Sequence, residues 1–99
     1  MQIHLNLQKR CIASEIKRQY ELSLQQVLRA RQPSRKQELK TEALRQIQER
    51  ADLVGLRGKH PELQPGSRHE VLLKVDEESG RCRLYLEHEP VLEVRLELP

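Results

Sequence analysis

The sequence has very few aromatic side chains. It contains no Phe and no Trp, and Tyr20 and Tyr85 are its two tyrosines. Proteins that hold single-stranded nucleic acid stack bases on aromatic rings, so an extended surface of that kind is not expected. An aliphatic core also buries less area per residue than an aromatic one, which favours a second copy of the chain covering part of the surface.

Long apolar runs and cysteine motifs are also missing. No stretch approaches the roughly 20 apolar residues that a membrane span needs. The opening MQIHLNLQKRC has a polar residue at every second position, so we expect no signal peptide and a cytoplasmic location. Cys11 and Cys82 lie far apart and outside any C-x-x-C spacing, which is typical of two thiols in a reducing compartment.

Charge is abundant and unevenly distributed. The formal net charge is +3, with 33% charged and 36% hydrophobic residues, as in a soluble globular domain. Residues 1–60 carry 13 Lys/Arg and 6 Asp/Glu, a balance of +7, whereas residues 61–99 carry 5 and 9, a balance of −4. Such polarity can attract an anionic partner, or it can let one half complement the other within the fold or across a dimer.

Hydrophobic periodicity predicts a short strand followed by a long helix. Ile3, Leu5 and Leu7 alternate with polar residues, which indicates a strand within residues 1–7. From residue 8 to 32 the apolar residues recur at helical spacing instead. The members of this stripe are Ile12, Ile16, Tyr20, Leu24, Val27 and Leu28.

A second helix is predicted directly after the first. Pro33 disfavours helical geometry at the residue before it, and Ser34 and Gln37 form the S-x-x-Q pattern of a capping box. We expect a helix over residues 34–56 that ends at Gly55 and Gly58. Its apolar face is Leu39, Ala43, Leu44, Ile47, Ala51 and Val54.

The last third of the chain predicts a loop and three strands. Residues 57–69 read as a loop, and alternation returns over residues 70–99. Gly80 is expected to be left-handed in the first hairpin turn, and Glu89-Pro90 to form the second corner. The predicted buried face is Val71, Leu73, Val75, Cys82, Leu84, Leu86, Leu92, Val94, Leu96 and Leu98.

These elements define the expected fold class. Residues 1–99 form a single α+β domain in two layers, with the order β-α-α-β-β-β. An antiparallel helical hairpin packs on a small antiparallel sheet whose C-terminal part is a three-stranded meander. The first strand can pair with the meander, cross to another protomer, or be the frayed start of the first helix.

No catalytic constellation is visible in the sequence. The four histidines are dispersed, and the one zinc set worth weighing, Cys82 and His88 with His69 or Cys11, matches no standard spacing. As a nucleophile–base pair, Cys82 and His88 would lie too far apart on one strand. The carboxylates of residues 76–78 are typical of a solvated turn. We therefore predict no enzyme and no catalytic, cofactor or metal site.

The corner between the two helices is the strongest candidate site. Its cations are Arg29, Arg31, Arg35, Lys36 and Lys40. The first two suit the C-terminal end of a helix, where the helix dipole stabilises positive charge. Arg35 and Lys36 fall in the first turn of the second helix, where the dipole disfavours cations, so structure alone does not explain them.

Two functions follow as expectations. The first is a small non-catalytic interaction module that self-associates or binds another protein through its helical hairpin or sheet face. The alternative is a basic nucleic-acid-associated protein that contacts phosphates through the inter-helix corner, with little reading of bases.

Overall fold

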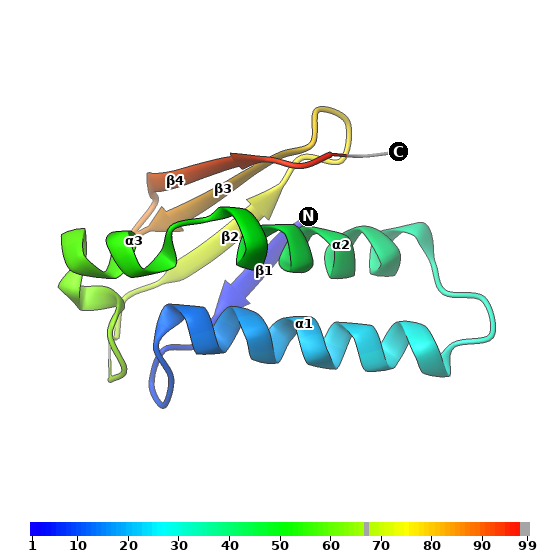
Figure 1. Cartoon of the computed structure of the whole chain (residues 1–99), viewed down its shortest axis with the longest axis horizontal. Helices are drawn as coiled ribbons and strands as arrows, with labels where there is room; N and C mark the ends of the chain where they lie inside the picture. The colour runs from blue at the N-terminus through cyan, green and yellow to red at the C-terminus, as the bar shows by residue number, and fades with distance from the viewer. Residues whose placement is uncertain (67, 98–99) are drawn as a thin grey trace.

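The computed structural model describes residues 1–66 and 68–97, and it has the expected α+β architecture. Four antiparallel strands in the order β1-β2-β3-β4 form one layer, and the helices form the other (Figure 1). The last three strands are the predicted C-terminal meander. The elements are β1 (Gln2–Leu5), α1 (Ile12–Arg29), α2 (Arg35–Arg50), α3 (Leu53–Lys59), the 3₁₀ turn η1 (Pro61–Leu63), β2 (Val71–Val75), β3 (Arg81–Leu86) and β4 (Glu89–Arg95).

The first strand pairs within its own chain. β1 lies antiparallel to β2, with Gln2 opposite Lys74 and Leu5 opposite Val71. Of the three alternatives for this segment, pairing with the meander is therefore correct. Ile3 and Leu5 are buried on the helix side of the sheet, which we call the inner face, while His4 is exposed on the outer face.

The first helix is shorter than its apolar stripe predicts. It was expected over residues 8–32 but runs over Ile12–Arg29. At its start, the Asn6 side chain accepts a hydrogen bond from the amide of Gln8, and this local turn competes with helical geometry. At its end, Ala30 is already extended, three residues before Pro33, because the chain must reverse direction there.

The predicted second helix is broken in two. Residues 34–56 were expected to form one helix, but α2 ends at Arg50 and α3 begins at Leu53. Asp52 caps the new helix by accepting the amide of Gly55 at 2.7 Å. Gly55 and Gly58 therefore lie inside α3 and do not end the predicted helix. A side chain at position 55 would collide with the Asp52 carboxylate, which explains the glycine there.

The capping box at the start of α2 is confirmed. The Gln37 amide donates to the Ser34 hydroxyl at 3.2 Å, and the Ser34 amide donates to the Gln37 side chain at 3.0 Å. Both bonds satisfy amides that have no partner inside the helix. The start of α2 is thus fixed by local sequence.

Replacing Ser34 with alanine is expected to lower the free energy of unfolding by about 1 kcal/mol, because the Gln37 amide loses its acceptor. Urea titration followed by circular dichroism measures the change. Ser34→Asp keeps an acceptor at this position and should stay within a few tenths of a kcal/mol of the wild type. A loss in Ser34→Asp as large as that in Ser34→Ala would contradict this account of the cap.

The second hairpin corner differs from the prediction. Gly80 has the expected positive φ of 73°, but the turn between β3 and β4 is Glu87–His88, with φ values of 49° and 69°. Two left-handed residues make a two-residue turn that matches the twist of the strands. Glu89 and Pro90, expected at the corner, instead begin β4, an edge strand in which proline is tolerated.

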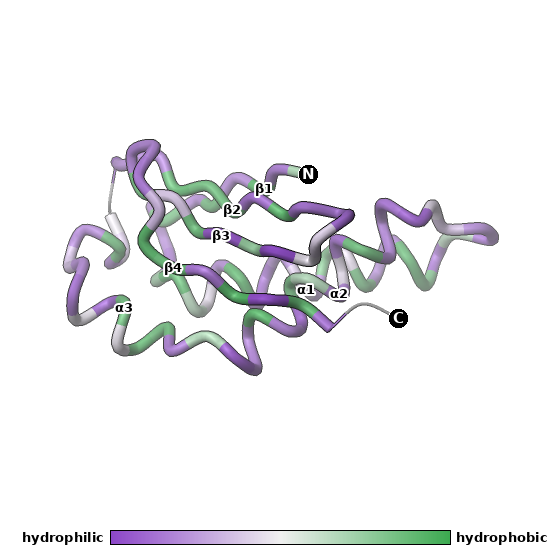
Figure 2. The backbone as a smooth tube through the Cα atoms, turned by 90° about the horizontal axis from the view of Figure 1, so that it is seen from above, coloured by the Kyte–Doolittle hydropathy of each residue, from purple (hydrophilic) through white to green (hydrophobic). Residues whose placement is uncertain are grey.

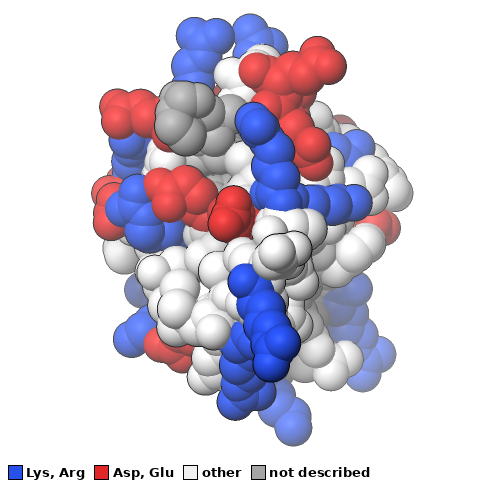
Figure 3. Space-filling view, turned by 90° about the vertical axis from the view of Figure 1, so that its right-hand side faces the viewer, with Lys and Arg blue, Asp and Glu red and all other residues white. Residues whose placement is uncertain are grey.

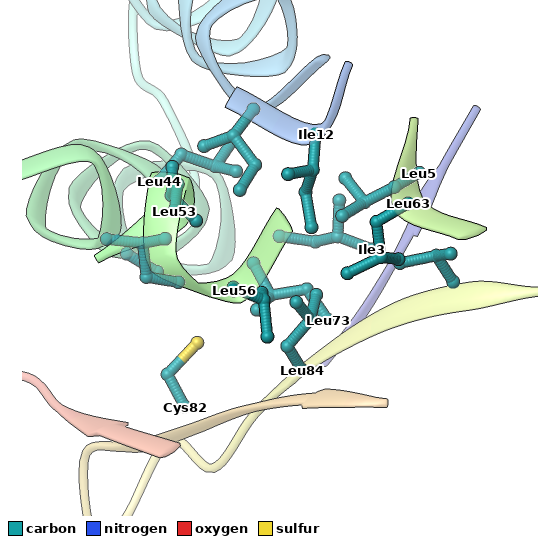
Figure 4. Close-up of a cluster of buried hydrophobic side chains, with 14 of the residues drawn as sticks. Ile3, Leu5, Ile12, Leu44, Leu53, Leu56, Leu63, Leu73, Cys82 and Leu84 are labelled. Atoms are coloured by element: carbon teal, nitrogen blue, oxygen red, sulfur yellow. The ribbon is translucent and has the colours of Figure 1, made fainter. Parts of the chain in front are cut away.

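A single aliphatic core fills the space between the sheet and the helices. Figure 4 shows side chains from the helices, such as Ile12 and Leu44, meeting strand residues such as Leu73 and Leu84. The inner-face residues of β2 and β3 are buried as predicted. Leu92 and Val94 are half-buried because β4 is an edge strand, and the predicted burial of Leu98 falls outside the described residues.

The helical stripe is buried only where it faces the sheet. Ile12 and Ile16 are buried, Leu24 and Val27 are half-buried, and Leu28 is 75% exposed. The reason is visible in Figures 1 and 2, where the end of the α1–α2 hairpin extends past the sheet. The apolar face predicted for the second helix is also only partly buried, since Val54, which lies in α3, is 68% exposed.

Candidate functional site

The projecting end of the helical hairpin carries the predicted basic residues. We call residues 28–40, which cover the last turn of α1, the connection and the start of α2, the hairpin tip. At its base the Ser23 and Thr41 hydroxyls lie 2.6 Å apart in a buried contact between the helices. The Thr41 hydroxyl also donates to the Gln37 carbonyl at 2.9 Å. The Ser23–Thr41 contact joins the two helices at the base of the tip, and the second bond, within α2, fixes the direction of the Thr41 hydroxyl.

All five predicted cations lie on this tip. Arg29 and Arg31 flank the C-terminal end of α1, and Arg35, Lys36 and Lys40 lie on α2. Lys40 is half-buried and the other four are exposed. Glu38 is the single acidic residue between positions 28 and 40, so the formal charge of the tip is +4. Figure 3 faces this end of the molecule and shows Lys and Arg side chains over its lower half.

The tip cations are not neutralised by neighbours. Among residues 1–66 and 68–97, none of the five has a carboxylate oxygen within 4.0 Å. Arginines farther from the tip on the same helices are paired: Arg18 with Glu15, Arg45 with Glu42, and Arg50 with Glu97. Ion pairs thus neutralise these three arginines, whereas the five cations of the tip have no such partner among the described residues.

The first turn of α2 adds backbone donors to these cations. Gln37 and Glu38 donate their amides to Ser34, but the amides of Arg35 and Lys36 have no acceptor among the described residues. Free amides at a helix N-terminus attract anions, and the helix dipole adds to the effect. The side chains of Arg35 and Lys36, whose charge the helix dipole disfavours, therefore lie next to two backbone amides without an acceptor.

The candidate zinc and nucleophile residues do not come together. Cys82 is buried, and burial raises the pKa of its thiol to about 12, so it is protonated and unreactive. His88 was expected on the same strand and face as Cys82, but it lies in the β3–β4 turn with an 81% exposed side chain, 3.7 Å from Glu70. His69 pairs instead with Glu87 at 3.1 Å. Among the described residues, no group of three or more His, Cys, Asp and Glu is placed to hold a metal ion.

The other thiol, that of Cys11, lies at the N-terminal end of α1. Its Sγ is 3.2 Å from the Ser14 hydroxyl, and hydrogen bonding to Ser14 lowers the pKa of the thiol. Cys11 is half-buried and forms no disulfide.

A second basic surface was missed by the sequence interpretation. The residues of β3 that alternate with its buried positions are Arg81, Arg83 and Tyr85, and they lie on the outer face of the sheet. Lys74 of β2 is opposite Arg83 on the same face. The sequence did contain an indication of this surface, because these residues alternate with the predicted buried residues of a strand. They lie, however, in a half of the chain that is acidic overall. Among the acidic residues of that half, Glu93 of β4 pairs with Arg81 and Arg83 of this face.

The protein is a two-layer α+β domain whose helical hairpin projects past the sheet. The cations at the tip of this hairpin have no carboxylate partner among the described residues. Residues 1–88 match one family model, so the chain belongs to that uncharacterised protein family. No curated protein and no solved structure matches the chain. No helix among the described residues is long and apolar enough to cross a membrane.

Proposed function

We propose that this chain is a non-catalytic binding module whose hairpin tip holds the phosphate backbone of a nucleic acid. One observation carries the proposal: five cations on a projecting hairpin have no carboxylate within 4.0 Å among the described residues. Lys17, Arg57 and Lys59 also lack a carboxylate within 4.0 Å among the described residues, so the tip is distinguished by five such cations gathered at one projecting end.

The chemistry of the tip fits phosphates better than carboxylates of a folded protein. Three of the five cations are arginines, whose planar guanidinium groups can hold two phosphate oxygens at once. The amides of Arg35 and Lys36 add donors of fixed direction. The tip carries no aromatic ring, so contacts to the backbone of a duplex or a structured RNA are expected, with little base reading.

Binding of a short DNA duplex, followed by fluorescence anisotropy, tests the proposal. Affinity should fall steeply as salt rises, because each phosphate contact releases counterions. The double variant Arg35→Glu/Lys36→Glu should bind at least about tenfold more weakly and lose about two units of the salt slope. The variant should stay folded, because the helix dipole favours acidic residues in this first turn.

Lys9→Glu/Arg10→Glu is the matched control. It also replaces an adjacent Lys and Arg pair by two Glu, and both residues are exposed, before the opposite end of α1. Its charge change is identical, so a general loss of positive charge would weaken both variants equally. The proposal requires a clearly larger loss at the tip, and it is wrong if the wild type does not bind at low salt.

Self-association through the hairpin is a second candidate, and the exposed Leu28 favours it. Leu28 is 75% exposed, and the half-buried Leu24 lies one turn before it on the same helix face. Two tips in direct contact would repel each other, so the second copy must dock along α1. Light scattering at micromolar concentration tests this: a dimer that Leu28→Ser converts to a monomer supports it, and a strictly monomeric wild type contradicts it.

A further inference from the structure

The outer face of the sheet carries a hollow next to Tyr85. The helices cover only the inner face, and Figure 2 shows the four strands of the sheet side by side. The hollow has a volume of about 310 Å³ and is lined by residues of three neighbouring strands together with Met1 and Asp76. The residues that matter here are Gln2 of β1, Lys74 of β2, and Arg81, Arg83 and Tyr85 of β3.

Cations outnumber carboxylates around this hollow. Arg81 and Arg83 share one carboxylate, that of Glu93, with N–O distances of 3.6 and 3.3 Å. Lys74 has no carboxylate within 4.0 Å among the described residues. Asp76 also lines the hollow, but its carboxylate accepts the backbone amides of residues 78 and 79 in the β2–β3 turn. Lys74, Arg81 and Arg83 therefore have one carboxylate within 4.0 Å, that of Glu93, and the Asp76 carboxylate also borders the hollow.

Tyr85 gives the hollow a flat apolar wall. Its ring is half-buried, and the Lys74 ammonium lies 4.7 Å from the ring centroid. Arg83 and Tyr85 lie on the same face of β3, and the Tyr85 side chain, followed by the charge of Glu93, raises the pKa of the Arg83 guanidinium. An exposed cation–π contact is weak, so an incoming flat ring can displace the flexible lysine side chain toward a nearby anion.

We propose that this hollow binds one nucleoside phosphate, with the base on the Tyr85 ring and the phosphate held by Lys74, Arg81 and Arg83. Every base has a π-face and can stack on tyrosine, and guanidinium groups match the geometry of phosphate oxygens. A bare anion would leave the ring unused, and a neutral ring would leave the excess charge uncompensated. A nucleoside phosphate satisfies both features.

This site is separate from the hairpin tip and stands without it. The ligand can be a free mononucleotide or one unpaired unit of a single strand, since the chemistry is the same. A single ring accommodates one base, which agrees with the scarcity of aromatic residues elsewhere in the chain. Titrations of ¹⁵N-labelled protein with AMP, inorganic phosphate and a short oligo(dT) distinguish these sources.

Binding of AMP should shift the amide signals of β2 and β3 and should be at least about tenfold tighter than binding of inorganic phosphate. Tyr85→Leu keeps an apolar side chain over Leu72 but removes the ring, and it should weaken AMP binding about tenfold. Tyr85→Phe keeps the ring and should retain most of the affinity. Arg83→Gln should weaken AMP and phosphate binding alike. Tighter binding of oligo(dT) than of AMP would assign the site to a single strand, and the reverse order to a free nucleotide.

Three results would overturn the proposal: AMP bound no better than phosphate, equal losses in Tyr85→Leu and Tyr85→Phe, or shifts confined to the hairpin tip. The variant Arg35→Glu/Lys36→Glu should leave AMP binding unchanged, and Tyr85→Leu should leave duplex binding unchanged. Failure of the tip proposal and failure of this one are therefore distinguishable.

Discussion

Replacing Glu15 with glutamine is expected to lower the free energy of unfolding by about 2–3 kcal/mol at pH 7. The Glu15 carboxylate is fully buried and accepts four hydrogen bonds, two of them from the Arg18 guanidinium at 2.6 and 3.0 Å. The Asn6 amide at 3.3 Å and the Gln19 side chain at 3.2 Å supply the others. A glutamine would turn an NH₂ group toward these donors in a place that water does not reach.

The same carboxylate makes stability depend on pH. Burial alone would raise the pKa of Glu15, but hydrogen bonds from Arg18, Gln19 and Asn6 outweigh it, and the pKa lies below the ordinary value of 4.5. The unfolded state therefore binds a proton first as the pH falls, and it gains relative to the folded state. The stability that Glu15 contributes is fully present above about pH 5, and it is lost as the pH falls through the folded-state pKa.

Urea titrations of the wild type and Glu15→Gln at pH 7 and pH 3 measure both effects. The difference in unfolding free energy between the two proteins should shrink at pH 3. Glu21→Gln, an exposed position on the same helix, should stay within about 0.5 kcal/mol of the wild type at pH 7. A difference between wild type and Glu15→Gln that is constant from pH 7 to pH 3 would show that the charge of Glu15 does not contribute.

The sequence predicted those elements whose signals are local. The capping box of Ser34 and Gln37, the left-handed Gly80 and the alternating strands all depend on residues close together in the chain. The break at Asp52 was missed because the apolar spacing continues through it, and only the bond to the Gly55 amide reveals a new helix. The Glu87–His88 turn was missed because neither residue is a typical left-handed residue.

The residues of the candidate site could be predicted from the sequence, but their position on a projecting hairpin could not. The five cations of the tip are plain in the sequence, yet their projection depends on how much longer the helices are than the strands. An α1 of 18 residues spans about 27 Å, whereas a β3 of 6 residues spans about 20 Å. The outer-face hollow depends on strand register, which places Lys74, Arg83 and Glu93 side by side across three strands. Register is a non-local property that composition does not report.

The segment that follows β4 is tied to α2 by side chains, and Gln46 is the central one. The Leu96 amide donates to the carbonyl of Gly80, which directly precedes β3, so the backbone groups of Glu97 point away from the sheet. There the Gln46 side chain takes the place of a further strand: its Oε1 accepts the Glu97 amide at 2.9 Å, and its Nε2 donates to the Glu97 carbonyl at 3.1 Å. Arg50 donates to the Arg95 carbonyl at 3.2 Å in the same way.

Replacing Gln46 with leucine is expected to lower the free energy of unfolding by about 2 kcal/mol, because both backbone groups of Glu97 lose their partners. Gln48→Leu is the matched control, since among the described residues the buried Gln48 Nε2 has no hydrogen-bond partner. That change should be neutral or slightly stabilising. If Gln46→Leu were as stable as Gln48→Leu, the Gln46 contacts with the Glu97 backbone would not contribute to stability.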